Sequence, residues 1–336
     1  MVMQKKSSLK FSQINLACVS GASGFVGKRL VEQLMSEGFL VRVLTRNSKL
    51  SVPDGVEVFY ADLVLKTCNL KGFFSGCNVF FHCAGDAQNP MRMHALHVEG
   101  IERLLKAFSE EIDLAGHAMH WIQLSSVGVY GKLINHPGKV RKISELSRTH
   151  PFGEYEVTKD KADKLLLEAA KSSKFTFSIL RPSNIVGLNM SSQSFRGLIK
   201  SIIKRHFFYI GSFHSVSNYI HVDDVVSALL LCSRSSKATN QIFNLSNDCK
   251  LSDIVLSLSL YIKIKHKNLI VPEWLIRFMV SITPAFFNFP LTQNRIDVLV
   301  SMTHYSNSKI ERLLKFSPKR FIPEFAVEYF KATCGK

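Results

Sequence analysis

The sequence lacks the cysteine arrangements that build a disulfide framework or hold a zinc ion. Its 336 residues include seven cysteines, an odd number, and these stand far apart with no C-x-x-C pair among them. This usage is typical of a chain in a reducing compartment, so we predict a cytoplasmic protein. Two histidine pairs have helical spacing, His94 with His97 and His117 with His120, but neither has a cysteine or carboxylate as an evident third ligand. We therefore predict that the protein holds no metal ion.

The sequence also lacks an uninterrupted apolar run that would span a bilayer. Its most apolar window, 278–294, contains two prolines and is bracketed by two arginines. We predict a buried pair of helices here and no transmembrane segment. Peripheral membrane contact through the apolar segment 270–291 stays open as an alternative.

Acidic residues are scarce. Lys and Arg number 43 against 26 Asp and Glu, which gives a formal net charge of +17. Such a charge attracts anions, which include phosphorylated metabolites, nucleic acids and acidic membrane surfaces. No nucleic-acid-binding motif accompanies the basic residues, so we predict a small-molecule substrate as partner and no nucleic acid.

The sequence does have a regular alternation of short apolar runs and helical patterns. The apolar runs occupy 14–21, 40–46, 56–63, 78–85, 120–126 and 175–182, and helical patterns start at 28, lie near 98–108 and lie around 155–171. Apolar runs of this length, bounded by turn residues, are typical of strands buried on both faces. Their alternation with helices predicts an α/β protein with a Rossmann doubly wound parallel sheet.

The alternation of apolar runs and helical patterns becomes less regular in the second half of the chain. This change predicts a smaller, interleaved C-terminal substrate domain. The predicted units are a flexible N-terminus at 1–12, an NAD(P)-binding Rossmann domain at 13–182 and a mainly substrate-binding domain at 183–336. Within the last unit, about 218–247 has the pattern of a helix and a strand that return to the Rossmann sheet.

The stretch "SGASGFVG" at 20–27 contains three glycines at three-residue spacing, between the first predicted strand and the first predicted helix. A sharp turn at Gly21 requires a residue that tolerates positive φ, and a pyrophosphate can approach the backbone only where no Cβ intrudes, at Gly24. Gly27 lets the helix lie close to the strand. Since the N-terminus of that helix attracts anions, the pattern predicts a dinucleotide-binding loop.

The second predicted strand lacks the acid that would bind the ribose hydroxyls of NAD. It ends in "VLTRN", where Arg46 can pair with the 2′-phosphate of NADP, so the pattern favours NADP over NAD without deciding between them. Asp62, at the end of the third predicted strand, is a candidate acceptor for the adenine amino group.

Tyr155 and Lys159 stand four residues apart in a helical pattern and therefore share one face. The ammonium group would lower the pKa of the phenol, so that Tyr155 could exchange a proton near neutral pH. The same spacing recurs at two other tyrosines, but only Tyr155 follows soon after the strand that ends at Ser126. The Ser126 hydroxyl could hold a substrate oxygen while Tyr155 moves the proton.

These motifs resemble the extended short-chain dehydrogenase/reductase family, and specifically its NAD-dependent epimerase/dehydratase group, which acts largely on nucleotide sugars. From about Asn15 to Asn247 the chain reads, in family order, "SGASGFVG", "ADL", "FHCAG", "HVEGIERLLKA", "LSSVGVYG", "YEVTK", "ILRPSNIVG", "YIHVDDVVSA" and "FNLS". The resemblance implies a nicotinamide cofactor, NAD or NADP, and hydride transfer between it and a substrate carbon.

The resemblance also implies roles for individual residues. Ser126 and Tyr155 would meet the reacting oxygen, and Lys159 would bind the nicotinamide ribose and lower the pKa of Tyr155. The cofactor would contact Gly21, Ser23, Gly24, Phe25, Val26, Gly27, Arg46, Asp62, Leu63, Ala84, Tyr155 and Lys159. We expect a homodimer.

The chain departs from the family pattern at several positions. Members that dehydrate sugars carry an Asp-Glu pair directly after the catalytic hydroxyl, where this chain has Val127 and Gly128, so we predict no 4,6-dehydration. His97 replaces a usual asparagine. Ser217 replaces an arginine that clamps the substrate diphosphate. The residues predicted to contact substrate are His97, Asn184, Arg196 and Lys200, and either of the last two could replace that arginine.

Three functions follow from these patterns. The first is a nucleotide-sugar epimerase or 4-keto reductase with tyrosine as proton donor and acceptor, for example in the synthesis of surface-polysaccharide precursors. The second is an NADPH-dependent reductase of a non-nucleotide ketone, sterol-like or flavonoid-like, which the apolar segment and the missing arginine favour. The third is a non-catalytic scaffold that senses the cofactor.

Overall fold

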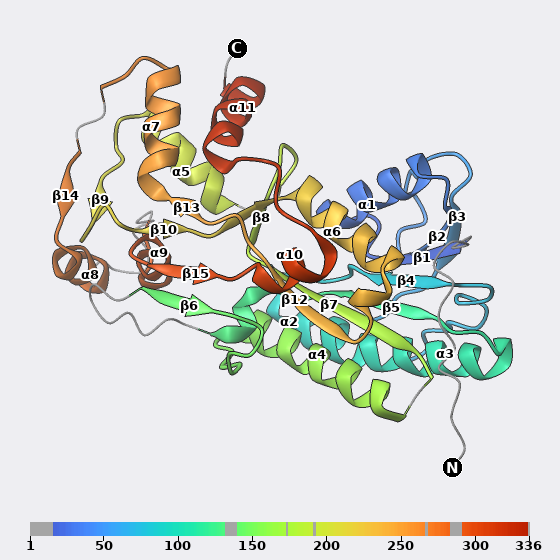
Figure 1. The fold of residues 1–336 in the computed structure, drawn as a ribbon. Coiled ribbons are helices and arrows are strands. Elements are labelled where there is room, and N and C mark those ends of the chain that lie inside the picture. Colours follow the sequence, from blue (N-terminus) through green and yellow to red (C-terminus); the bar gives the residue numbers. More distant parts are fainter. Residues whose placement is uncertain are drawn as a thin grey trace.

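The computed structural model describes residues 16–131, 140–172, 174–190, 193–265, 268–282 and 291–334. The predicted flexible N-terminus at 1–12 and residues 283–290 of the apolar segment lie outside these ranges. Within the described ranges the chain forms an α/β unit with a large sheet and a smaller lobe beside it (Figure 1).

The centre of the molecule is a seven-stranded parallel sheet in the order β12-β7-β5-β4-β1-β2-β3. Its strands are β1 (Leu16–Ser20), β2 (Leu40–Thr45), β3 (Glu57–Tyr60), β4 (Val79–His82), β5 (His120–Leu124), β7 (Thr176–Pro182) and β12 (Gln241–Leu245). The predicted doubly wound parallel sheet is confirmed. The order reverses between β1 and β4, and ligands of such sheets bind at the carboxyl ends of the strands on either side of that reversal.

Helices cover both faces of the sheet because alternate strand residues point to opposite sides. On one face Ala17 and Val19 of β1 pack in one apolar cluster with α1 (Phe25–Ser36) and α6 (Val222–Arg234). On the other face Cys18 packs with α3 (Gly100–Ala115) and α4 (Glu154–Ser172). Figure 1 shows these two helical layers above and below the strands. The sequence predicted this sheet well because its central strands β1, β4, β5 and β7 are buried on both faces.

The smaller lobe is built from the segments around and after the sheet strands β7 and β12. Its core packs α5 (Gln193–Ile203), α7 (Leu251–Tyr261) and α11 (Ile322–Cys334) around aromatic rings, among them Phe195 stacked on Phe325 at 5.7 Å between ring centroids. The remaining α-helices and strands are α2 (Pro90–His94), β6 (Arg141–Ile143), β8 (Asn184–Val186), β9 (Tyr209–Ile210), β10 (Val216–Ser217), β11 (Tyr219–His221), β13 (Cys249–Lys250), β14 (Ile270–Val271), α8 (Glu273–Ile282), α9 (Gln293–Leu299), β15 (Thr303–Tyr305) and α10 (Ser308–Leu314).

The chain returns from this lobe to the sheet through α6 and β12, and β12 pairs with β7 in parallel. The domain boundaries given above stay a prediction. None of the helices in the described part of the chain is long and apolar enough to cross a membrane.

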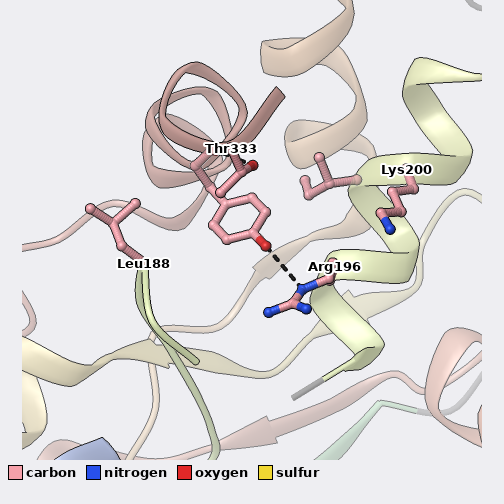
Figure 2. Close-up of a pocket in the computed structure, with 6 residues that line it drawn as sticks. Leu188, Arg196, Lys200 and Thr333 are labelled. Atoms are coloured by element: carbon pink, nitrogen blue, oxygen red, sulfur yellow. Dashed lines mark hydrogen bonds between the residues drawn. The ribbon is translucent and has the colours of Figure 1, made fainter. Parts of the chain in front are cut away.

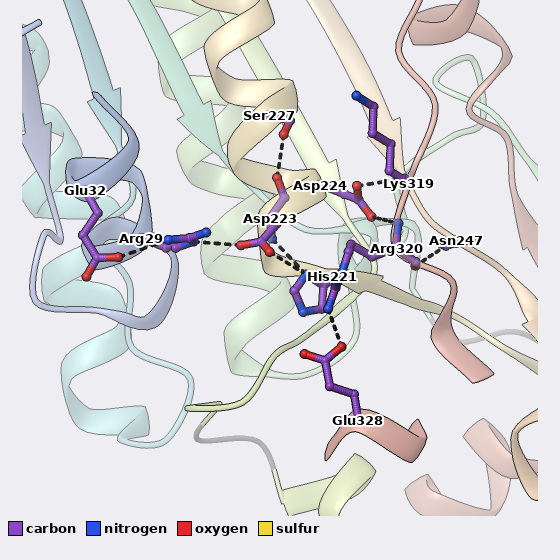
Figure 3. A network of polar contacts seen from close by, with 10 residues as sticks. All are labelled: Arg29, Glu32, His221, Asp223, Asp224, Ser227, Asn247, Lys319, Arg320 and Glu328. Carbon is purple, nitrogen blue, oxygen red and sulfur yellow. Dashed lines mark hydrogen bonds and ion pairs between the residues drawn. The ribbon is translucent and has the colours of Figure 1, made fainter. Parts of the chain in front are cut away.

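The motif "YIHVDD" connects the two parts of the molecule (Figure 3). Asp223, in the first turn of α6, accepts a hydrogen bond from Nε of Arg29 on α1 at 2.8 Å. Its neighbour Asp224 is buried and accepts from the backbone amides of Lys319 and Arg320 at 2.9 and 3.1 Å. The motif therefore holds α1, α6 and the segment before α11 together.

Candidate active site

The glycine loop follows β1 at the point where the strand order reverses. Gly21 has φ of +76°, and a Cβ there would lie 2.5 Å from the amide nitrogen of Ala84, so only glycine fits. A Cβ at Gly27 would collide with the carbonyl oxygen of Gly21. The loop can therefore make its bend, and α1 can start against it, only without these side chains.

The start of α1 has the properties of an anion site. Gly24 is its N-cap residue, no side chain caps the helix, and its first turn carries no acidic residue. The amides of Phe25, Val26 and Gly27 therefore stay available to an anionic ligand, as at other helix N-termini. The glycine loop and the uncapped N-terminus of α1 lie at the point where the strand order reverses. Together they form a site that fits the pyrophosphate of a dinucleotide.

Arg46 and Asp62 lie at the same edge of the sheet. Arg46 directly follows β2 and is exposed, while Asp62 follows the neighbouring strand β3, with Oδ1 accepting from the amide of Val64 at 3.1 Å. Strands β2 and β3 pair in parallel, so Arg46 and Asp62 lie at the carboxyl edge of the sheet, which also carries the glycine loop. The buried Leu63 lies at the same edge. This placement is compatible with contacts to the adenosine half of a dinucleotide, which stay a prediction.

Ser126, Tyr155 and Lys159 converge at the carboxyl end of β5. Ser126 follows this strand, and its Oγ accepts from the amide of Gly128 at 3.0 Å. The Ser126 hydroxyl lies close enough to the phenol of Tyr155 on α4 to lower the pKa of that phenol. One helical turn further on, the buried Lys159 donates from Nζ to the carbonyl oxygen of Leu124 at 3.0 Å. The structure thus brings together the three residues that the sequence proposed as catalytic.

The predicted lowering of the pKa of Tyr155 is not found. Burial raises this pKa to about 12, the negative charges of Glu156 and Asp163 act in the same direction, and the Ser126 hydroxyl opposes them. A phenolate loses solvation when it is buried, and Lys159 is hydrogen-bonded to a backbone carbonyl. Tyr155 is therefore protonated at neutral pH and can donate a proton.

His97 lies behind this trio. Its Nε2 accepts from the amide of Asp86 at 2.9 Å, so Nδ1 carries the proton and donates to Oγ1 of Thr158 at 2.8 Å. Burial and the charge of Lys159 lower the pKa of His97 to about 3, which keeps the ring neutral. With 1% of its surface exposed, His97 does not fit the predicted contact with substrate. Its ring packs edge-on against Tyr155 and positions it.

A buried polar network under α4 was not identified from the sequence. Asp163 Oδ2 accepts from Nε and Nη2 of Arg181 at 3.1 and 3.0 Å and from Oγ of Ser125 at 2.8 Å, and its Oδ1 accepts from Gln123 at 3.0 Å. These contacts attach α4 to β5 and β7 just below Lys159. The i, i+4 spacing of Lys159 and Asp163 is the signal that could have revealed it.

The predicted substrate residues of the smaller lobe line two separate cavities. Arg196 and Lys200 border a cavity of about 330 Å³ between α5 and α11, which is also lined by Leu188, Ile199, Tyr329 and Thr333 (Figure 2). Arg196 donates there to Oη of Tyr329 at 3.2 Å and to the carbonyl oxygen of Met190 at 3.0 Å.

Asn184 and Ser217 line the second cavity with Leu198, Val216, Asn218, Tyr219, Leu251, Val298 and Leu299. Neither Arg196 nor Lys200 is among these residues, because both side chains lie on the side of α5 that borders the first cavity. The structure therefore does not bring a replacement for the missing arginine to Ser217. Among the residues that the structure describes, no three histidine, cysteine or acidic side chains gather as metal ligands would.

Residues 17–246 match the model of the NAD dependent epimerase/dehydratase family. The chain belongs to this family. The match covers well over half of the chain and contains the glycine loop, the Ser126–Tyr155–Lys159 trio and the "YIHVDD" motif. The resemblance seen in the sequence is confirmed.

Individual relatives differ in what they act on. The chain is 26% identical over 227 residues to 4-hydroxy-2-methyl-3-oxo-4-farnesyl-3,4-dihydroquinoline-1-oxide ketoreductase of Stigmatella aurantiaca, covering 64% of this chain and 63% of that protein. It is 24% identical over 268 residues to UDP-glucose 4-epimerase of Vibrio cholerae, covering 76% of this chain and 78% of the relative.

Among solved structures, UDP-glucuronic acid 4-epimerase from Bacillus cereus in complex with NAD shares the fold, with a TM-score of 0.70 and 17% identity. The likeness covers 94% of this chain and 98% of that one. The family description names NAD, and the Bacillus cereus structure contains NAD.

Proposed function

We propose that the protein is an NAD(P)-dependent epimerase or 4-keto reductase of a nucleotide sugar. The observation that carries the proposal is the convergence of Ser126, Tyr155 and Lys159 at the end of β5, next to the glycine loop that fits a dinucleotide. When bound, the nicotinamide supplies or accepts a hydride at the substrate carbon.

The residues of this chain provide the proton path. Tyr155 is protonated and donates to a substrate carbonyl oxygen as the alcohol forms, and it takes the proton back in the reverse direction. Ser126 holds the same oxygen through its hydroxyl. Lys159, which donates to the carbonyl oxygen of Leu124 one helical turn from Tyr155, would bind the ribose of the nicotinamide.

Support for a nucleotide sugar comes from the cavity bordered by Arg196 and Lys200. Two cations beside a cavity of about 330 Å³ suit an anionic small molecule such as a sugar diphosphate. The full-length likeness to a UDP-sugar epimerase agrees with this assignment.

The test combines binding and turnover. Mass spectrometry of nucleotides released from the purified protein identifies the cofactor, and turnover of UDP-glucose, UDP-galactose and dTDP-4-keto sugars is then measured for the wild type and for Tyr155→Phe. We expect cofactor affinity to stay nearly unchanged and turnover to fall by roughly two to four orders of magnitude in the variant. Equal turnover of both proteins would remove Tyr155 from the mechanism, and cofactor binding without turnover of any ketone would favour the scaffold.

A reductase of an apolar, non-nucleotide ketone is the second candidate. Its support is that one relative is a ketoreductase with a farnesylated substrate by name. Calorimetry with UDP and dTDP separates the candidates, since binding of neither at millimolar concentration would exclude the nucleotide sugar. The homodimer stays a prediction, which sedimentation velocity would test.

A further inference from the structure

Helix α8 exposes a row of large apolar side chains. On one face Ile276 is buried in a small cluster with Ile210 and Ile296. On the opposite face Trp274 and Phe278, at four-residue spacing, are 70% and 56% exposed, and Ile282, four residues further on, is 62% exposed. The outer face of a surface helix normally carries polar and charged residues, so this row is unusual.

The exposed row continues onto the strand before the helix. Leu269, directly before β14, and Ile270, its first residue, are exposed as well. In Figure 1, β14 and α8 lie at the outer edge of the smaller lobe, away from the seven-stranded sheet. We call Leu269, Ile270, Trp274, Phe278 and Ile282 the apolar edge.

Exposed cations lie on the segments that lead into β14 and into its partner strand β9. Strand β14 pairs in parallel with β9, and Ile270 lies opposite Tyr209, so the segments that lead into the two strands reach the same end of the pair. These segments carry the exposed residues Lys204, Arg205, Lys263 and Lys265. The charged residues of α8 are already compensated, because Arg277 forms ion pairs with Glu273 at 2.7 Å and with Asp297 at 2.8 Å.

We propose that the apolar edge docks on an anionic phospholipid surface. Trp274, Phe278 and Ile282 enter the boundary between headgroups and acyl chains, and the four cations meet the negatively charged headgroups. A second copy of this chain is a poorer occupant, since its own cations would be brought close to these and the net charge of each chain is +17. In water alone these apolar side chains would stay exposed, because no apolar surface would bury them.

The test uses the full-length protein and extruded vesicles of phosphatidylcholine, with or without about 30% phosphatidylserine. Vesicle-bound protein is measured by flotation, and tryptophan emission is recorded in parallel. The chain has two tryptophans, of which Trp121 is fully buried, so a vesicle-dependent blue shift reports on Trp274. We expect binding and a blue shift with the anionic vesicles, both weakened by high salt.

Matched variants locate the docking surface. The double variant Phe278→Ser with Ile282→Ser keeps the Trp274 reporter and should lower the bound fraction at least about tenfold. The double variant Lys263→Glu with Lys265→Glu should lower the bound fraction about fivefold for each lysine replaced. The control Met91→Ser with Leu114→Ser removes side chains that are 90% and 82% exposed elsewhere, and should bind like the wild type. Thermal unfolding followed by circular dichroism checks that all variants fold.

Several results would overturn the proposal. The wild type could fail to bind anionic vesicles, or the apolar variant could bind as well as the control. Sedimentation velocity could show a dimer that only the apolar variant dissociates, without vesicle binding by any protein, which would make the edge an interface between copies of the chain. None of these measurements uses turnover or cofactor, so they leave the proposed function untouched.

Discussion

The side chain of Glu156 passes over Gly128, at the place that a Cβ of residue 128 would occupy. Such a Cβ would lie 2.8 Å from Cγ of Glu156 and 3.3 Å from Oγ of Ser126. On its other side the Glu156 carboxylate lies over Gly153, whose Cβ would be 2.7 Å from Oε2. The family resemblance implies a carboxylate pair at 127–128 in members that dehydrate sugars, and this chain has Val127 and Gly128 there. Helix α4 nevertheless brings a carboxylate to the same neighbourhood.

Removing the charge of Glu156 should lower the pKa of Tyr155. The negative charge disfavours the phenolate and therefore raises this pKa, so in Glu156→Gln the phenol should ionise at lower pH. A reductive turnover that needs protonated Tyr155 would then lose activity at lower pH than in the wild type. The pH dependence of kcat measures this shift, with the exposed neighbour exchanged in Glu154→Gln as control. An alkaline limb that stays in place in Glu156→Gln would show that the carboxylate does not act on Tyr155.

A methyl group at residue 128 should displace Glu156. The Cβ of Gly128→Ala would overlap Glu156 Cγ, and overpacking of this kind typically costs about 1–3 kcal/mol of unfolding free energy. Because Glu156→Ala removes the clashing atom, the double variant should recover most of that loss. Urea unfolding of the two single variants and the double variant gives the coupling energy. Additive effects would mean that Glu156 does not occupy this space.

The sheet and the cofactor loop could be predicted because their residues act through local rules. Strands such as β4 are buried throughout and appear as apolar runs, and the bend at Gly21 requires a residue without a Cβ. The contacts of Glu156 and Asp163 could not be predicted in this way. They depend on which glycine or strand end faces each turn of α4, and this register is set by tertiary packing, not by spacing along the chain.

The sequence did not predict where two residues of the smaller lobe lie, because tertiary packing decides which side of a helix they occupy. The prediction that Arg196 or Lys200 replaces the arginine missing at Ser217 rests on their charge and on the helical pattern that carries them. The side of α5 on which they lie is decided by the aromatic core around Phe195 and by α11. The pKa of Tyr155 was predicted from one neighbour, Lys159, whereas burial has the largest effect.

Asp163 should be essential for stability because it neutralises a buried arginine. In Asp163→Ala the guanidinium of Arg181 would stay buried without its partner, which typically costs about 3–5 kcal/mol of unfolding free energy. The exposed pair Glu168–Lys171 on the same helix provides the control, since Glu168→Ala should change stability by less than about 1 kcal/mol. Urea unfolding at neutral pH measures both. Similar small losses in the two variants would show that the buried pair does not hold α4 on the sheet.

Arg46 should distinguish the two nicotinamide cofactors. Its exposed guanidinium at the end of β2 can pair with the 2′-phosphate of NADP, whereas NAD offers no anion at that position. In Arg46→Ala the affinity for NADPH should therefore fall about tenfold or more, as expected for the loss of a charge-assisted hydrogen bond of roughly 1.5–3 kcal/mol, and the affinity for NADH should change little. Calorimetric titration of both cofactors measures the ratio, with Lys49→Ala as a control for the loss of a nearby positive charge. Equal weakening of both cofactors would mean that Arg46 does not contact the phosphate, and the preference would then have to come from the backbone around the glycine loop.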